Sequence, residues 1–118
     1  MSNPFNPGDD LIFQLESGFG LLRVLAVEGE GAGTVWHLMA YDEFFPDVES
    51  AERALDQPAP LPVRKAHMAL TNRAFERTPV ARLGNRPLAE HELDAYRDWL
   101  NTGRDVSDRS ALLMLGIR

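Results

Sequence analysis

Three histidines and two carboxylate pairs are the side chains of this 118-residue chain with the plainest capacity for chemistry. Histidine transfers protons near neutral pH and ligates metals, whereas carboxylates bind Ca²⁺ or Mg²⁺. No two of the histidines are at a spacing typical of a metal site, and neither carboxylate pair belongs to a loop of alternating oxygen ligands. We therefore predict no metal site, and packing or surface roles for the histidines. The residues concerned are His37, His67 and His91, and the pairs Asp9-Asp10 and Asp42-Glu43.

Sequence motifs for covalent or phosphoryl-transfer catalysis are missing. No serine lies in a Gly-x-Ser-x-Gly elbow, and no Gly-x-x-x-x-Gly-Lys or Gly-x-Gly-x-x-Gly loop occurs. The absence of cysteine excludes a disulfide scaffold, a thiol nucleophile and a cysteine-ligated zinc site. The sequence therefore predicts no catalytic residue and no cofactor, and it favours a binding protein over an enzyme.

Aromatic residues beside an acidic segment form the first candidate binding surface. Residues 42–56 hold six acidic side chains and one basic side chain, and aromatic residues flank the first two acids. Aromatic anchors rimmed by charge are common in protein interfaces. In the alternative interpretation, Phe44 and Phe45 are buried between a helix and a sheet; exposure of either would favour a surface for a basic partner. The predicted partner-binding residues are Asp42, Glu43, Phe44, Phe45, Glu49 and Glu52.

A basic segment supplies a second candidate site. Residues 64–86 hold six basic side chains and one acidic side chain. Arginine forks suit carboxylate and phosphate groups, so His67, Arg73, Arg77 and Arg82 could form an anion-binding site. Arg73 and Arg77 would share one face of a regular strand. Alternatively, these arginines pair with carboxylates of the N-terminal half.

The net charge of −6 is unevenly distributed along the chain. Residues 1–59 hold 11 acidic and 2 basic groups, a net of −9, whereas residues 60–118 hold 7 acidic and 10 basic groups, a net of +3. An acidic protein repels phosphates, so nucleic-acid binding is not expected. No apolar run approaches the ~18 residues of a membrane span, and the first residues do not resemble a secretory signal. We expect a soluble cytoplasmic protein.

The hydrophobic pattern predicts the elements that must position these residues. An extended arm over residues 1–9 precedes strands over 11–15 and 19–27, which a turn at Gly18 joins into a hairpin. A third strand covers 34–41, a helix begins at Pro46-Asp47, and a proline-rich connector covers 57–62. Further strands cover 66–75 and 80–83, and a helix covers 88–100, ending at Gly103. Residues 111–115 form either a short helix capped by Ser107 or an edge strand.

Three strands followed by mixed helices and strands indicate a single α+β domain over residues 1–118. The expected architecture is a small antiparallel sheet or an SH3-like barrel with two or three helices packed on it.

The leading hairpin, over residues 7–25, has a distinctive pattern of residues. It consists of Pro7-Gly8-Asp9-Asp10, the turn Glu16-Ser17-Gly18-Phe19-Gly20 and the strand Leu22-Arg23-Val24-Leu25. This pattern resembles the opening of the bacterial immunity protein 26 family. The resemblance implies an SH3-like start to the fold and neutralisation of a toxin by binding, without catalysis; it identifies no contact residue.

Two functions are consistent with the sequence. The leading one is a non-enzymatic binding domain whose acidic segment engages a basic protein partner, or which self-associates as a homodimer. The alternative is a small-molecule or anion-binding domain, possibly an enzyme, that uses the arginine and histidine cluster.

Overall fold

Five antiparallel strands form one open sheet in the computed structural model, which describes residues 4–57, 59–102 and 105–116. The strand order is β4-β3-β2-β1-β5, and each neighbouring pair is antiparallel. The predicted α+β class with an antiparallel sheet is therefore confirmed. The sheet does not close into a barrel, because β4 and β5 form its two edges. The strands are β1 (Asp9–Leu15), β2 (Gly18–Glu28), β3 (Val35–Phe45), β4 (Val63–Thr71) and β5 (Val80–Asn85).

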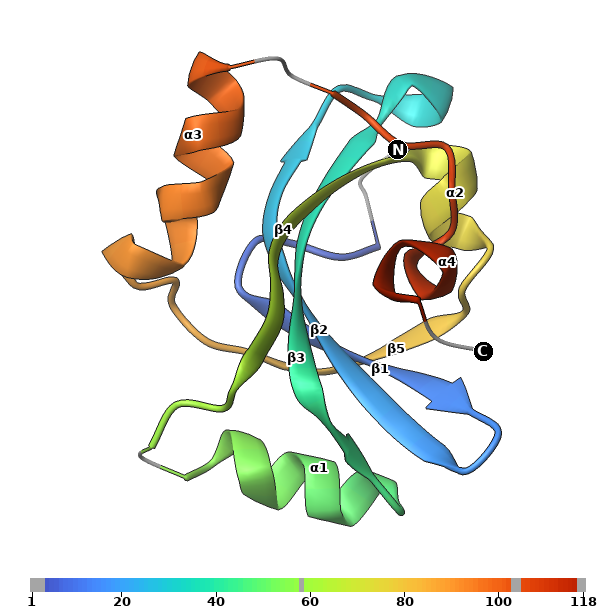
Figure 1. Ribbon diagram of the computed structural model, residues 1–118, viewed down its shortest axis with the longest axis vertical. Helices are drawn as coiled ribbons and strands as arrows, with labels where there is room; N and C mark the ends of the chain where they lie inside the picture. The colour runs from blue at the N-terminus through green and yellow to red at the C-terminus, as the bar shows by residue number, and fades with distance from the viewer. Residues whose placement is uncertain (1–3, 58, 103–104, 117–118) are drawn as a thin grey trace.

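Short helices pack on both faces of this sheet. Figure 1 shows α3 on one face and α2 with α4 on the other, while α1 lies across the end of the sheet at which β3 finishes. No described helix is both long enough and apolar enough to cross a bilayer. The helices are α1 (Val48–Leu55), α2 (Asn72–Glu76), α3 (Asp94–Asn101) and α4 (Ala111–Leu115), with 3-10 turns η1 (Gly31–Gly33) and η2 (Glu90–Leu93).

Each face of the sheet has its own apolar core, because successive side chains of a strand point to opposite faces. On β3, Trp36 and Leu38 join the core beneath α2 and α4, whereas Met39 and Tyr41 join the core beneath α1 and α3. Strands buried on both faces are apolar almost throughout, which is why residues 19–27 lack a clean alternation in the sequence.

The local signals of the first half of the chain are borne out. β1 and β2 form the predicted hairpin, in which Leu15 is opposite Gly18. The Asp47 carboxylate accepts a hydrogen bond of 2.7 Å from the Ser50 N–H and caps α1. A cap and an apolar stripe are short-range features, so they act wherever the helix finally packs.

The predicted strand over 66–75 is wrong in its second half. The Thr71 hydroxyl accepts a hydrogen bond of 3.1 Å from the Ala74 N–H, and this cap ends β4 and starts α2. Arg73 lies in α2 and Arg77 at its C-terminal end, so the two do not share a strand face as predicted.

The C-terminal elements also differ in detail from the expectation. The predicted helix over 88–100 begins as the 3-10 turn η2 and becomes α-helical only at Asp94. Residues 111–115 form the helix α4, and Ser110 rather than Ser107 caps it. Ser107 instead pairs with the edge of β4, where its N–H donates to the Ala69 carbonyl at 2.8 Å. Gly103 and positions 1–3 of the predicted arm lie outside the described residues.

Candidate functional site

A cavity of about 680 Å³ lies between α1, the following connector, α3 and the sheet. This volume falls within the roughly 300–1,000 Å³ that is typical of small-molecule sites. Its walls are mainly apolar, and most of its polar groups come from the segment around η2 and α3. The lining residues are Met39, Tyr41, Ala54, Leu55, Gln57, Ala59, Pro60, Leu61, Val63, Ala66, Arg86, His91, Glu92, Asp94, Ala95 and Asp98.

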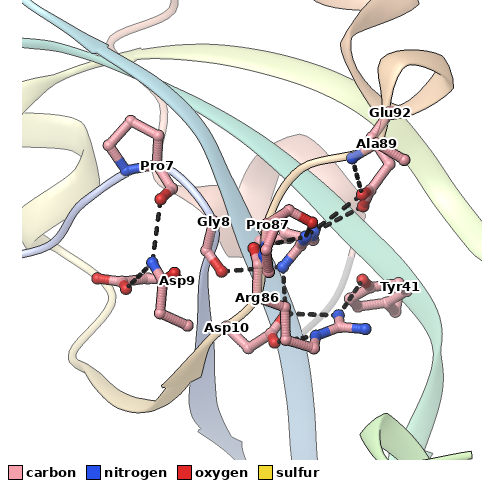
Figure 2. Close-up of polar contacts among 11 residues, drawn as sticks. Pro7, Gly8, Asp9, Asp10, Tyr41, Arg86, Pro87, Ala89 and Glu92 are labelled. Atoms are coloured by element: carbon pink, nitrogen blue, oxygen red, sulfur yellow. Dashed lines mark hydrogen bonds and ion pairs between the residues drawn. The ribbon is translucent and has the colours of Figure 1, made fainter.

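Arg86 and Tyr41 form a polar end of the cavity. Figure 2 shows the hydrogen bonds that join Arg86 to Asp10 and Tyr41. The Arg86 guanidinium donates to both carboxylate oxygens of Asp10, at 2.6 and 2.9 Å, and to the Tyr41 hydroxyl oxygen at 3.1 Å. The hydrogen bonds to Asp10 raise the pKa of Arg86. Burial, and then the Asp10 charge, raise the pKa of Tyr41. At neutral pH Arg86 is therefore a cation and Tyr41 a neutral donor.

Behind this polar end lies Arg23, whose side chain is 1% exposed. Its guanidinium donates to Asp10 at 3.2 Å and to Glu92 at 2.6 Å. It also donates to the backbone carbonyls of Gly8, Arg86 and Pro87. Burial raises the pKa of Glu92, but the hydrogen bonds from Arg23 and from the Ala89 N–H, with the Arg23 charge, lower it below its usual value.

Arg23 thereby connects the sheet to the segment that forms one wall of the cavity. The segment from Arg86 to Glu92 links β5 to α3, and Arg23 holds both ends of it against β1 and β2. No sequence motif assigns Arg23 or Arg86 to a site, and Tyr41 is expected only as one of the aromatic residues that flank Asp42-Glu43. The sequence does hold one indication of this role for Arg23, which is the single charged residue in the otherwise apolar stretch 19–27. A charge that is buried in such a strand must find partners.

Gly8 makes room for this arrangement. Its φ of +91° belongs to the region that favours glycine, and a Cβ there would lie 2.5 Å from the Arg86 carbonyl oxygen. The Gly8 carbonyl accepts from the Arg86 N–H at 3.0 Å and also from Arg23. Gly8 thus allows its own backbone and that of Arg86 to lie close together, and the carbonyls of both accept hydrogen bonds from the buried guanidinium of Arg23.

A second polar cluster lies under α3. The ring of His37 is completely buried; its Nε2 lies 2.5 Å from a Glu28 carboxylate oxygen and its Nδ1 lies 2.9 Å from Nε2 of His67. The rings of Tyr96 and Trp99 on α3 pack against His37, with centroids 4.6 and 4.5 Å away. The two histidines are 30 positions apart in the sequence, where no pattern connects them.

Both histidines of this cluster are neutral at pH 7. Burial, and to a smaller extent the electrostatic effects of His37 and Lys65, lower the pKa of His67 to about 4. Burial also lowers the pKa of His37, although Glu28 acts in the opposite direction. A Glu28–His37–His67 hydrogen-bonded chain with no net positive charge on either ring therefore lies beneath α3.

The structure separates the two phenylalanines of the predicted acidic surface. Phe45 is buried, whereas Phe44 is 44% exposed. Asp42 forms an exposed ion pair of 3.2 Å with Arg64. Glu43, Glu49 and Glu52 are exposed, and their carboxylates form no hydrogen bond or ion pair with any described residue.

The predicted anion-binding residues are dispersed. Arg73 and Arg77 both bind Asp108. Arg73 forms an ion pair of 2.6 Å with its carboxylate, and Arg77 donates to its backbone carbonyl at 2.9 Å. Arg82 lies 3.8 Å from Asp9, and His67 belongs to the cluster under α3. None of these four residues lines the cavity between α1 and α3.

No family model, curated protein or solved structure matches this chain.

A smaller cavity of about 310 Å³ lies beside the stacked rings of Trp36 and Phe75 and contains an unsatisfied hydroxyl. The Thr78 side chain lines this cavity and is 4% exposed, and its oxygen has no hydrogen-bond partner among the described residues. A buried hydroxyl without a partner destabilises a protein by about 1–3 kcal/mol.

We expect Thr78→Val to stabilise the protein, because valine has nearly the same shape and removes the unsatisfied hydroxyl. The expected gain in the free energy of unfolding is about 1 kcal/mol, measured by urea denaturation. Thr71→Val is the matched control: the Thr71 hydroxyl accepts from Ala74 and donates to Asp108, so this variant should be less stable. A loss of stability in Thr78→Val would mean that the hydroxyl has a partner in solution.

Proposed function

We propose that the chain is a binding domain that holds a small, largely apolar organic molecule in the cavity between α1 and α3. The cavity itself carries this proposal, since it combines a suitable volume, apolar walls and one defined polar end. Asp10 and Tyr41 fix the orientation of Arg86 at that end, so the donors that would orient a ligand are already in place.

Binding without catalysis is the function that the lining favours. The described lining residues include no serine, threonine, cysteine or lysine that could act as a nucleophile. Glu92 is held by Arg23, and the histidine pair under α3 is not part of the lining. Glu92 and the histidine pair are thus engaged elsewhere, whereas the side chains of His91, Asp94 and Asp98 remain in the lining without an ion pair among the described residues.

A saturable probe titration tests this proposal. Nile red, an uncharged apolar fluorophore, should bind the wild-type chain with one-to-one stoichiometry. Ala66→Phe fills the cavity from β4, where Ala66 is exposed at the lining, and should weaken binding about tenfold, or about 1.4 kcal/mol.

Ala81→Phe is the matched control, because Ala81 is exposed on β5 and lines neither cavity. It should bind the probe as the wild type does. Non-saturable fluorescence, or equal binding by wild type and Ala66→Phe, would contradict the proposal.

A protein-binding surface is a second candidate, and the exposure of Phe44 favours it. Phe44 lies beside Glu43, and the exposed Val48 and Glu49 follow on α1. An exposed aromatic side chain among unpaired carboxylates suits a basic partner. This candidate agrees with the resemblance of the hairpin to immunity proteins, for which the partner would be a toxin. Self-association and a cytoplasmic location stay predictions of the sequence.

Affinity capture under two salt conditions tests this second candidate. A partner held at low salt should be released at high salt, because screening weakens the attraction of exposed charges. Phe44→Ala should lose that partner, whereas Gln14→Ala, at an exposed position of β1, should retain it. Capture that is insensitive both to salt and to Phe44→Ala would contradict this candidate.

A further inference from the structure

Two hydrogen-bond donors at the polar end of the cavity, one on the buried Tyr41 and one on the half-exposed Arg86, have no acceptor among the described residues. Tyr41 is 7% exposed, and its oxygen accepts from Arg86, but its own O–H donates to no described residue. The Arg86 Nη1 group likewise makes no hydrogen bond with any described residue, since Asp10 and Tyr41 are bound through Nε and Nη2. Both side chains line the cavity.

These donors select for an oxygen acceptor rather than for a negative charge. Asp10 binds the Arg86 guanidinium through both carboxylate oxygens and balances its charge. A carboxylate ligand would therefore gain little net attraction there, whereas an amide carbonyl could accept from both donors at once. A buried donor that acquires its acceptor contributes about 0.5–1.5 kcal/mol.

The wall of the cavity that α3 forms is acidic. Asp94 and Asp98 are one turn apart on α3, so they lie on the same helix face, and both line the cavity. Their carboxylates form no ion pair within 4 Å among the described residues, because Arg97 pairs with Glu90 at 2.8 Å. Glu92 also lines the cavity, but Arg23 balances its charge. Two carboxylates without an ion pair among the described residues therefore remain at this wall, although Asp94 lies near enough to Arg97 for its charge to act on that guanidinium.

We propose that the ligand is an organic cation with an apolar body and an uncharged oxygen acceptor, such as an aromatic amide that bears an ammonium group. The acceptor binds Tyr41 and Arg86, the body fills the apolar space, and the ammonium lies near Asp94 and Asp98. This inference rests on the proposed function of the cavity, and it adds the chemical class of the ligand and its orientation.

Three matched probes test the class of ligand: 4-(aminomethyl)benzamide, benzamide and 4-carbamoylbenzoate, which are a cation, a neutral molecule and an anion. NMR titration of the wild-type chain should rank their affinities in that order. Tyr41→Phe should weaken all three by about 2–10-fold, through loss of one hydrogen bond.

Replacing both wall carboxylates, Asp94→Asn with Asp98→Asn, should abolish the preference for the cation over benzamide. Each exposed charge pair is worth about 0.2–1 kcal/mol, so the cation should lose about 2–30-fold in affinity across the two. Glu43→Gln with Glu49→Gln is the matched control, because it removes two charges from outside the cavity. It should preserve the ranking.

The two levels of the proposal fail separately. Equal affinities for the three probes, or a ranking that survives the double variant at Asp94 and Asp98, would overturn the ligand class. In that case, saturable binding of Nile red by the wild type that Ala66→Phe weakens would still support a binding cavity. If the wild type did not bind Nile red saturably, or if Ala66→Phe bound it equally well, the proposed function itself would be overturned.

Discussion

Arg23→Ala is expected to lower the free energy of unfolding by about 3–5 kcal/mol, a large part of the 5–15 kcal/mol typical of a domain. The variant removes the buried Arg23 guanidinium, whose nitrogens lie 3.2 Å from the Asp10 carboxylate and 2.6 Å from the Glu92 carboxylate. It also removes the donor to three backbone carbonyls. Urea denaturation measures the loss, and the Nile red titration should show a damaged cavity, since Arg23 holds the segment from Arg86 to Glu92.

Arg73→Ala is the control, because it removes an ion pair of the same length that is exposed rather than buried. Arg73 binds Asp108 at 2.6 Å, as close as Arg23 binds Glu92, but its side chain is 73% exposed. This variant should cost less than about 1 kcal/mol. Arg23→Lys keeps the charge without the planar fork and should fall between the two. An Arg23→Ala protein as stable as Arg73→Ala would contradict the central role of the buried guanidinium.

Stability is expected to fall as the pH is lowered from about 6.5 to about 4, because of the histidine cluster. The pKa of His67 is about 4 in the folded protein and about 6.5 when the chain is unfolded. Between these values the unfolded chain binds more protons, so folding weakens as the pH falls. The whole shift corresponds to about 3 kcal/mol, and partial exposure reduces the expected loss to about 1–2 kcal/mol. His37, whose pKa is also lowered, acts in the same direction.

His67→Gln should flatten this pH dependence, because the titrating ring is removed while a hydrogen-bonding group remains beside His37. His91→Gln, at an exposed position, should leave the wild-type profile unchanged. Unfolding measured by denaturant at several pH values gives the three profiles. A wild-type profile that His67→Gln does not alter would show that other groups cause the acid sensitivity.

The charged surfaces were only partly visible in the sequence. Acidic residues 42–56 and the adjacent aromatics could be identified, but not which phenylalanine is exposed. Phe44 and Phe45 are neighbours on β3, so their side chains point to opposite faces; strand register places Phe45 in the core and leaves Phe44 outside. The arginines of residues 64–86 bind different partners, because α2 interrupts the strand predicted to align two of them.

The sequence by itself determined the elements whose signals lie within a few residues: the hairpin around Gly18, the helix capped by Asp47 and the α+β class. Tertiary structure alone decided the candidate sites. His37 meets His67 from 30 positions away and Arg23 meets Glu92 from 69 positions away, through pairings set by strand order and by the return of the chain over the sheet. The cavity likewise exists only where α1 and α3 face the same sheet. Periodicity and capping act over single turns, whereas these contacts depend on how distant segments pack, which no local pattern encodes.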